Sequence, residues 1–310
     1  MHPYERLVEP LISVIVPCYN YAAFVGEALH SVLSQDCPSF ELIVVDDGST
    51  DTSAYEIQKV LDAAQGKTSA QRVVFLRQTN QGVSAALNAG LAEAQGEFVA
   101  TFDADDVMVP GRLRLQADYL AQHPEVGCVG GIAQRIDGEG VLLPKKQKKR
   151  QVQRYSFAEV LAKGIVVGGN LAMYRREAID RVGGYDPSIK VQDFQITHKI
   201  AFAGYFVDVL PVIVTLYRKH AGGLSANYEA EYHYALQVIS AFRDHPAFES
   251  GKARLLIKIL GPAVIYNKRL AWSLIKQVPA RQWDRQYFKR LRHFLFKWRG
   301  IKSHRDLSCM

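Results

Sequence analysis

The stretch that decides the fold is residues 11–51, LISVIVPCYNYAAFVGEALHSVLSQDCPSFELIVVDDGSTD. Its first part, LISVIV at residues 11–16, is a short β-branched run ended by Pro17, which predicts a buried strand. An amphipathic stretch follows, and after a break at Pro38 a second apolar run occupies residues 41–45. Strand, helix and strand in this order predict a βαβ unit with parallel strands.

The same alternation continues beyond this unit. Apolar runs predict strands at residues 73–76, 98–102 and 126–129, with helical patterns between them at residues 82–95 and 110–122. Such alternation predicts an α/β fold with a mainly parallel sheet and helices on both faces. Ligands of these sheets bind beyond the carboxyl ends of the strands, so polar residues there are the candidates for function.

Composition indicates a folded globular protein. The 310 residues are 48% hydrophobic and 22% charged, which suits one large α/β domain with a tail. Residues 1–10 contain Glu5 and Glu9 and no long apolar run, so we expect no secretory signal and a cytoplasmic location. The cysteines lack metal-ligand spacing and are expected to be reduced thiols without chemistry: Cys18, Cys37, Cys128 and Cys309.

Two acidic clusters come directly after predicted strands. The first, DDGSTD at residues 46–51, is either a functional loop or a turn that ends the strand and caps the next helix. The second, FDADD at residues 102–106, brings three carboxylates into four residues, where they repel one another unless water or a cation neutralises them. A hard divalent cation takes oxygen ligands of this kind, and the place at a strand's carboxyl end favours a metal site over a solvated loop.

Several short strings occur in a recognisable order: VIVPCYN at residues 14–20, VVDDGSTD at 44–51, NQG at 80–82 and FDADD at 102–106. Together they resemble the family 2 inverting glycosyltransferases of GT-A fold. GGYD at 183–186 and QDF at 192–194 are similar to the acceptor-side segments of that family. The resemblance implies a Rossmann-like GT-A domain at residues 1–225, followed by a basic, helical C-terminal region at residues 226–310.

For the donor, the resemblance implies a UDP-sugar. Asp47 would accept a hydrogen bond from uracil N3–H, and Tyr19 would stack on the base. The donor-binding residues implied are Pro17, Tyr19, Asn20, Asp47, Asn80, Gly82, Asp103, Ala104 and Asp105. The implied metal is Mn²⁺ or Mg²⁺, with Asp105 as the preferred direct ligand in a set made of Asp103, Asp105, Asp106 and His220.

The resemblance also implies a catalytic base, Asp193, which removes the proton from the acceptor hydroxyl. Gln192 stands where the family usually has Glu, so one neighbouring charge that would raise the pKa of Asp193 is missing. Asp193 also suits the N-cap of a helix. His220 is expected near the metal or the diphosphate, or else in solvent, and Arg218 and Lys219 are alternative phosphate contacts.

Positive charge is concentrated toward the C-terminus. Residues 251–310 contain 15 lysines and arginines and two aspartates, a net charge of +13, whereas the whole chain carries +7. A basic tail on an acidic body predicts an anionic partner, either lipid or nucleic acid. Apolar residues recur there at helical spacing among cations, as in an interfacial amphipathic helix or a helix packed on the body: Tyr287, Phe288, Leu291, Phe294, Leu295 and Trp298.

Two other stretches bear on location. The basic run KKQKKR at residues 145–150 is expected to be a solvated loop. Residues 255–266 are interrupted by Lys258 and Pro262, so they do not predict a membrane-spanning helix. The protein is therefore expected to lie on the inner face of the cytoplasmic membrane as a peripheral protein.

These observations predict a metal-dependent glycosyltransferase that moves a sugar from a UDP-sugar to a hydroxyl of a glycan acceptor. A membrane-seated acceptor would be a polyprenyl-diphosphate-linked saccharide, as in O-antigen or capsule assembly, and no nucleic acid is expected as a partner. A nucleotidyltransferase is one alternative, although residues 17–20 are not the Gly-rich phosphate loop of such enzymes. Another is a nucleic-acid-binding or non-catalytic nucleotide-sugar-binding protein that uses the basic tail.

Overall fold

The computed structural model describes residues 11–37, 39–144, 151–164, 166–220 and 228–296 and divides the chain into two compact units. The first contains Met1–Ser156 and Val166–Lys219, and the second contains Phe157–Ile165 and His220–Met310. The boundary expected after residue 225 lies outside the described residues. The sequence did not predict that Phe157–Ile165 belongs to the second unit.

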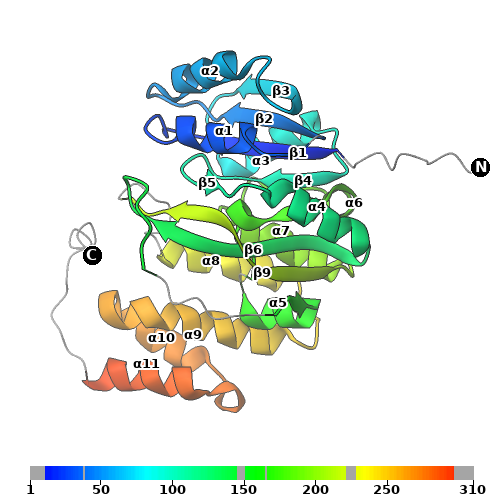
Figure 1. Cartoon of the computed structure of the whole chain (residues 1–310). Coiled ribbons are helices and arrows are strands. Elements are labelled where there is room, and N and C mark those ends of the chain that lie inside the picture. Colours follow the sequence, from blue (N-terminus) through cyan, green and yellow to red (C-terminus); the bar gives the residue numbers. More distant parts are fainter. Residues whose placement is uncertain (1–10, 38, 145–150, 165, 221–227, 297–310) are drawn as a thin grey trace, which may run out of the picture. The chain divides into compact units, whose positions relative to one another are not determined.

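The first unit is built on one mixed, mostly parallel sheet in the order β3-β2-β1-β4-β8-β6-β9-β5, with β7 also paired to β9 (Figure 1). The first four strands in this order, β3, β2, β1 and β4, are parallel to one another. Strands β6 and β9 run in the same direction as these four. Antiparallel to these are β8, β5 and β7. The strands are β1 (Ile12–Cys18), β2 (Phe40–Asp46), β3 (Ala70–Arg77), β4 (Phe98–Thr101), β5 (Val107–Met108), β6 (Val126–Ile136), β7 (Gln153–Tyr155), β8 (Met173–Arg175) and β9 (Phe206–Arg218).

Helices flank this sheet, as the sequence predicted. They are α1 (Val25–Leu33), α2 (Ser53–Ala64), α3 (Val83–Glu93), α4 (Arg112–Gln122), α6 (Arg176–Arg181) and α7 (Gln192–Phe202), with a 3₁₀ turn, η1, at Gly169–Leu171. The central strands are mainly apolar because both faces are covered, and every residue of β2 is buried, including Glu41 and Asp46. Cys18, Cys37 and Cys128 are buried and form no disulfide, and Cys309 lies outside the described residues.

Strand register gathers the polar loops at one edge of the sheet. Cys18 is opposite Asp46, and Ile15 is opposite Thr101, so β1, β2 and β4 end close together. Backbone hydrogen bonds continue this alignment past the strands, from the Asp47 amide to the Cys18 carbonyl at 2.8 Å and from Phe102 to Ile15 at 3.0 Å. The loops after these strands therefore meet at the edge where ligands of α/β sheets bind.

The second unit is helical. Its elements are α5 (Phe157–Lys163), α8 (Tyr228–Ser240), α9 (Phe248–Tyr266), α10 (Lys268–Gln277), η3 (Ala280–Gln282) and α11 (Arg285–Phe296). The central helix is α9, which contacts α5, α8, α10 and α11. Pro262 lies inside α9, which continues through it to Tyr266. Within the described ranges, none of the helices combines the length and the apolar character needed to cross a membrane.

Candidate functional site

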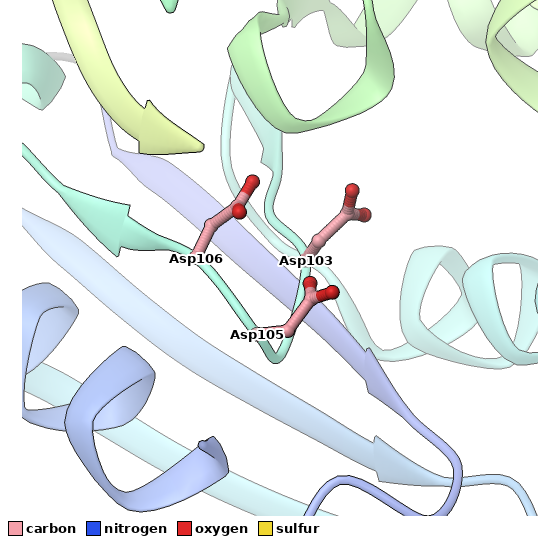
Figure 2. A group of neighbouring side chains, drawn as sticks. All are labelled: Asp103, Asp105 and Asp106. Atoms are coloured by element: carbon pink, nitrogen blue, oxygen red, sulfur yellow. The ribbon is translucent and has the colours of Figure 1, made fainter. Parts of the chain in front are cut away.

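An acidic cluster occupies the loop between β4 and β5. One carboxylate oxygen from each of Asp103, Asp105 and Asp106 lies within 4.8 Å of the others. Figure 2 shows the three side chains projecting to the same side of this loop. Oxygen ligands at this mutual distance fit a hard divalent cation such as Mg²⁺ or Mn²⁺. The geometry therefore suits the metal site that the sequence predicted at this position.

Burial and mutual repulsion dominate the electrostatics of the cluster. The pKa of Asp103 is raised well above its ordinary value, first by burial and then by the charges of Asp106, Asp105 and Asp193. Burial also raises the pKa of Asp106 to about 6, although hydrogen bonds from Asn170 and the Arg218 backbone oppose it. These carboxylates are poorly solvated and close to like charges, a situation that a bound cation would relieve.

A buried arginine lies beneath the cluster. The Arg112 guanidinium donates to the Asn170 carbonyl at 2.6 Å and to the Thr215 hydroxyl at 2.9 Å, and it is 1% exposed. The Asn170 side chain in turn donates to the carboxylate of Asp106. Burial lowers the pKa of Arg112 to about 9, while the negative charges of Asp106 and Asp103 oppose that decrease. Arg112 thus places a positive charge within the field of the acidic cluster.

Arg218 holds the same loop from the end of β9. Its backbone amide donates to the carboxylate of Asp106 at 2.8 Å, and its Nε donates to the Asp105 carbonyl at 2.9 Å. Its guanidinium also reaches the carboxylate of Glu27, and the side chain is 2% exposed. The hypothesis that Arg218 contacts phosphate is wrong in this structure, because the guanidinium is enclosed by protein acceptors.

Lys219 and His220, the two residues after Arg218, belong to different units. Lys219 is exposed and is the last residue of the first unit. His220 is the first residue of the second unit and is not among the residues grouped as a metal site. Its role as a metal ligand therefore stays a prediction.

Two tyrosines that the sequence did not single out border the cluster. Burial raises the pKa of Tyr21, and the charges of Asp105 and Asp103 raise it further. The pKa of Tyr217 is raised by burial and by the charges of all three cluster aspartates. Tyr21 follows β1 and Tyr217 lies in β9, so no local sequence signal links either phenol to residues 103–106.

Asp47 organises the loop on the donor side. Its Oδ1 accepts from Gln78 Nε2 at 2.7 Å and the Gln81 amide at 2.9 Å, and its Oδ2 accepts from the Gly82 amide at 2.8 Å. The Asn80 side chain donates to the Asp47 carbonyl at 2.9 Å. Asp47 is 3% exposed. A carboxylate oxygen accepts about two hydrogen bonds, so Oδ2 retains one acceptor position.

The other predicted donor residues lie at the same edge of the sheet. Asn20 has a left-handed backbone, with φ of 59°, and its side-chain oxygen accepts from the Thr50 amide at 2.8 Å. Tyr19 is 44% exposed, whereas Ala104 is buried. Asn20 therefore joins the loop after β1 to the loop after β2, next to an exposed aromatic ring.

A small pocket joins the acidic loop to the start of α7. Asp193 and Asp103 both line it, together with Pro17, Val83, Leu87, Thr101, Phe102, Gly169, Tyr174, Tyr185 and Gln192. Asp193 is the second residue of α7, whereas the N-cap position belongs to Val191. The carboxylate of Asp193 accepts from the Phe194 amide at 2.7 Å. The N-cap alternative for Asp193 is therefore wrong, and its carboxylate lines the pocket.

Two of the residues that line this pocket, Tyr174 and Tyr185, form a pair. Tyr174 and Tyr185 are almost fully buried, their side chains hydrogen-bond to each other, and burial followed by nearby charges that include Asp193 raises the pKa of both. Asn88 holds the backbone of Tyr185 through two hydrogen bonds, of 2.8 and 3.0 Å. The segment before α7 is thus anchored to α3, which fixes the position of Tyr185 in the lining of the pocket.

Comparisons with known proteins agree on one family. A family model described as glycosyl transferase family 2 matches residues 13–183. An uncharacterized glycosyltransferase of Nostoc sp. is 30% identical over 292 residues, which cover 88% of this chain and 84% of that protein.

Two solved structures share the fold. One is S. aureus TarS 1-349 in complex with UDP-GlcNAc, with a TM-score of 0.66 and 22% identity over 88% of this chain and 82% of that one. The other is the mannosyltransferase PcManGT from Pyrobaculum calidifontis in complex with GDP-Man and Mn²⁺, with a TM-score of 0.64 and 24% identity over 98% and 84%. At this identity the likeness is one of fold, the GT-A fold expected from the motifs.

Proposed function

Because the chain belongs to glycosyl transferase family 2, we propose that it is an inverting enzyme that moves a sugar from a UDP-sugar to a hydroxyl of a glycan acceptor. One observation carries this proposal. Asp193 lines the same pocket as Asp103, whose carboxylate belongs to the acidic cluster at the carboxyl edge of the sheet. A base and a site for the leaving diphosphate thus flank the place where a sugar would lie.

Asp193 is the proposed catalytic base. The acceptor oxygen forms a bond to the anomeric carbon on the face opposite the leaving group, and its proton passes to the carboxylate of Asp193. The bond between that carbon and the diphosphate oxygen breaks, and its electron pair leaves with UDP. Attack from the opposite face inverts the anomeric carbon. Its place in the first turn of α7 and the hydrogen bond that its Oδ1 accepts from the Phe194 amide support this role.

The three aspartates are the proposed holders of Mn²⁺ or Mg²⁺. When bound, the cation would hold the diphosphate and neutralise the charge that develops on it. From the family resemblance we assign direct ligation to Asp105. Each carboxylate oxygen of Asp106 accepts one hydrogen bond from the protein and keeps an acceptor position for the cation or for a water bound to it. His220 is a further candidate ligand, proposed from the family resemblance alone. PcManGT, which was solved in complex with GDP-Man and Mn²⁺, supports a divalent cation in this site.

Uracil is the proposed base of the donor nucleotide. The Oδ2 atom of Asp47 has room for one more donor, which the N3–H of uracil would supply. Tyr19 is exposed next to this loop and would stack on the base. Pro17, Asn20, Asn80, Gly82 and Ala104 complete the proposed donor site. The TarS complex with UDP-GlcNAc supports a UDP-sugar, whereas PcManGT contains GDP-Man, so the donor assay below includes both.

The proposed acceptor is a polyprenyl-diphosphate-linked saccharide in surface-polysaccharide assembly, such as O-antigen or capsule. The excess of positive charge in the C-terminal region supports an acceptor held at an anionic membrane. The enzyme would then be peripheral on the inner face of the cytoplasmic membrane.

A ligand panel tests the proposed function. The purified chain would be heated with UDP-, GDP-, dTDP- and CDP-sugars, each with Mn²⁺ and with a chelator, because a ligand that binds only the folded state raises the melting temperature. We expect a metal-dependent increase with a UDP-sugar, and release of UDP when a lipid-linked acceptor is added. A metal-dependent increase with a GDP-sugar instead would overturn the uridine assignment, and silence across the panel would overturn the proposed enzyme.

A further inference from the structure

The outer helices of the second unit carry an excess of cations. Residues 267–296 contain eight lysines and arginines and one acidic residue, Asp284. That aspartate lies 3.4 Å from Arg254 and accepts a hydrogen bond from the Tyr287 amide, so it is occupied within the unit. The charge that remains on α10 and α11 is strongly positive.

Aromatic side chains lie among these cations on α10 and the end of α11. Trp272 is 48% exposed, and its ring stacks on Phe294 with 5.8 Å between the ring centroids. Lys276 Nζ lies 4.8 Å from the Trp272 ring and Lys268 Nζ lies 4.8 Å from the Phe294 ring. The apolar residues of α10 that face the core are different ones, Ala271, Leu274 and Ile275. Trp272 is therefore not one of the side chains that pack α10 against the core.

A second aromatic group lies at the start of α11. Trp283 and Phe288 are about half exposed and meet edge to face at 5.8 Å, while Tyr287 beside them is buried. Leu295, seven positions after Phe288 and so on the same helical face, is 60% exposed. One buried residue, Tyr287, anchors α11, and the large apolar side chains on its other face meet solvent.

We propose that α10, η3 and α11 form a surface that binds an anionic phospholipid bilayer. Exposed Trp and Phe rings would enter the boundary between head groups and acyl chains, and the long Lys and Arg side chains would reach the lipid phosphates. Nucleic acid is the weaker partner, because Lys276 and Lys268 cover the ring faces on which bases would stack. Leu295 adds an aliphatic contact that a phosphate polymer would not use.

This surface deepens the proposed function, since it rests on an acceptor held in a membrane, but it can be tested without any sugar. The test is sedimentation of the full chain with vesicles of phosphatidylcholine, with and without phosphatidylglycerol. We expect binding that needs phosphatidylglycerol and weakens as salt is added. Failure of donor transfer with intact vesicle binding would count against the enzyme assignment alone.

Two double variants separate the apolar and the electrostatic contributions. Phe288→Ala with Leu295→Ala should weaken vesicle binding at least about tenfold, because two partly inserted side chains are removed. Lys289→Glu with Arg292→Glu should weaken it by a similar factor and flatten its salt dependence. The matched controls are Tyr55→Ala, which truncates a ring that is 67% exposed on α2, and Lys59→Glu, which reverses an exposed charge on the same helix.

Circular dichroism and the melting temperature would establish that each variant remains folded. Equal losses in the α2 controls, or binding to neutral vesicles as strong as to anionic ones, would overturn the proposal. Single-stranded RNA provides the other arm, and RNA binding that outlasts vesicle binding as salt is raised would assign this surface to nucleic acid instead.

Discussion

The guanidinium of Arg218 and the carboxylate of Glu27 form an ion pair, with N and O 2.5 Å apart, between residues 191 positions apart in the chain. Arg218 ends β9 and Glu27 lies in α1, so the pair spans the acidic loop that Arg218 also holds through Asp105 and Asp106. Arg218 therefore acts as a clamp that links the loop that would hold the cation to α1.

Removing this clamp should weaken donor binding. Arg218→Met deletes the hydrogen bond to the Asp105 carbonyl, and we expect the Mn²⁺-dependent affinity for UDP to fall about tenfold or more. Glu27→Gln keeps a neutral acceptor for the guanidinium and should have a smaller effect. Isothermal titration would measure both, with the exposed Arg181→Met as control. A lower melting temperature with unchanged UDP affinity would restrict Arg218 to a structural role.

Asp105→Ala should abolish metal-dependent donor binding and leave the fold intact. The substitution removes a carboxylate from the cluster but keeps the backbone carbonyl that Arg218 contacts. We expect the affinity for UDP with Mn²⁺ to fall by about 100-fold. The melting temperature in chelator should match that of the unsubstituted chain. Unchanged UDP affinity with Mn²⁺ would remove Asp105 from the metal site.

Asp193→Asn should separate binding from transfer. The amide keeps the size of the side chain but cannot take the acceptor proton, so kcat should fall by roughly 10²–10⁴-fold. The affinity for UDP-sugar should be unchanged, because the proposed base acts on the acceptor hydroxyl and not on the donor. Steady-state kinetics and titration of UDP measure the two quantities. Robust turnover by this variant would place the base elsewhere.

Metal binding should weaken as pH falls. The pKa of Asp106 is raised to about 6, so its carboxylate is ionised above that pH and protonated below it in the metal-free protein. A cation favours the ionised form and must displace the proton at lower pH. The increase in melting temperature caused by Mn²⁺ should therefore shrink as pH is lowered from about 7.5 to about 5.5. An increase independent of pH would mean that the cluster does not take up the cation.

Gly48→Ala should destabilise the protein more than an ordinary loop substitution. Gly48 has φ of 73°, and a Cβ there would lie 2.7 Å from the backbone nitrogen of Asn80. Backbone strain and this overlap together should cost about 3 kcal/mol or more. Gly66→Ala is the matched control, because φ is 71° there but no atom lies within 4 Å of the new Cβ, and its cost should be about 1 kcal/mol. Equal urea denaturation midpoints for the two variants would contradict the close approach.

The sequence predicted those parts of the fold that have a local signal. An apolar run of three or more residues lies in each of β1, β2, β3 and β4, and the acidic loop follows β4 in the chain, so the strands and the loop could be located by position alone. The full length of β6 could not be predicted in this way. Only residues 126–129 were predicted as strand, because Gly130 and Gly131 interrupt the apolar run, yet the strand extends to Ile136. Both glycines leave room for valines, Val167 and Val214, which a Cβ would meet at 2.5 and 2.6 Å.

The supporting contacts of the site have no local signal at all. Arg112 is charged and stands in an amphipathic helix, which predicts an exposed position, but it is buried beneath the acidic cluster. Asn170 donates to Asp106 of that cluster, and Glu27 accepts from Arg218, which holds the acidic loop; both pairs join residues far apart in the chain. Long-range polar contacts of this kind depend on the assembled sheet, so periodicity and motif spacing do not reveal them.

The place of α5 in the second unit affects how the chain can be made. Val160 and Leu161 are buried, and Leu161 packs so closely against α9 that a Cβ on Gly251 would lie 2.6 Å from it. A ribosome delivers α5 well before α9, so the nascent chain carries the apolar side chains of α5 uncovered until α9 emerges. Synthesis that stops early would leave α5 open to chaperones and proteases. The buried side of α5 is therefore covered only after the part of the first unit from β8 to β9 has been made.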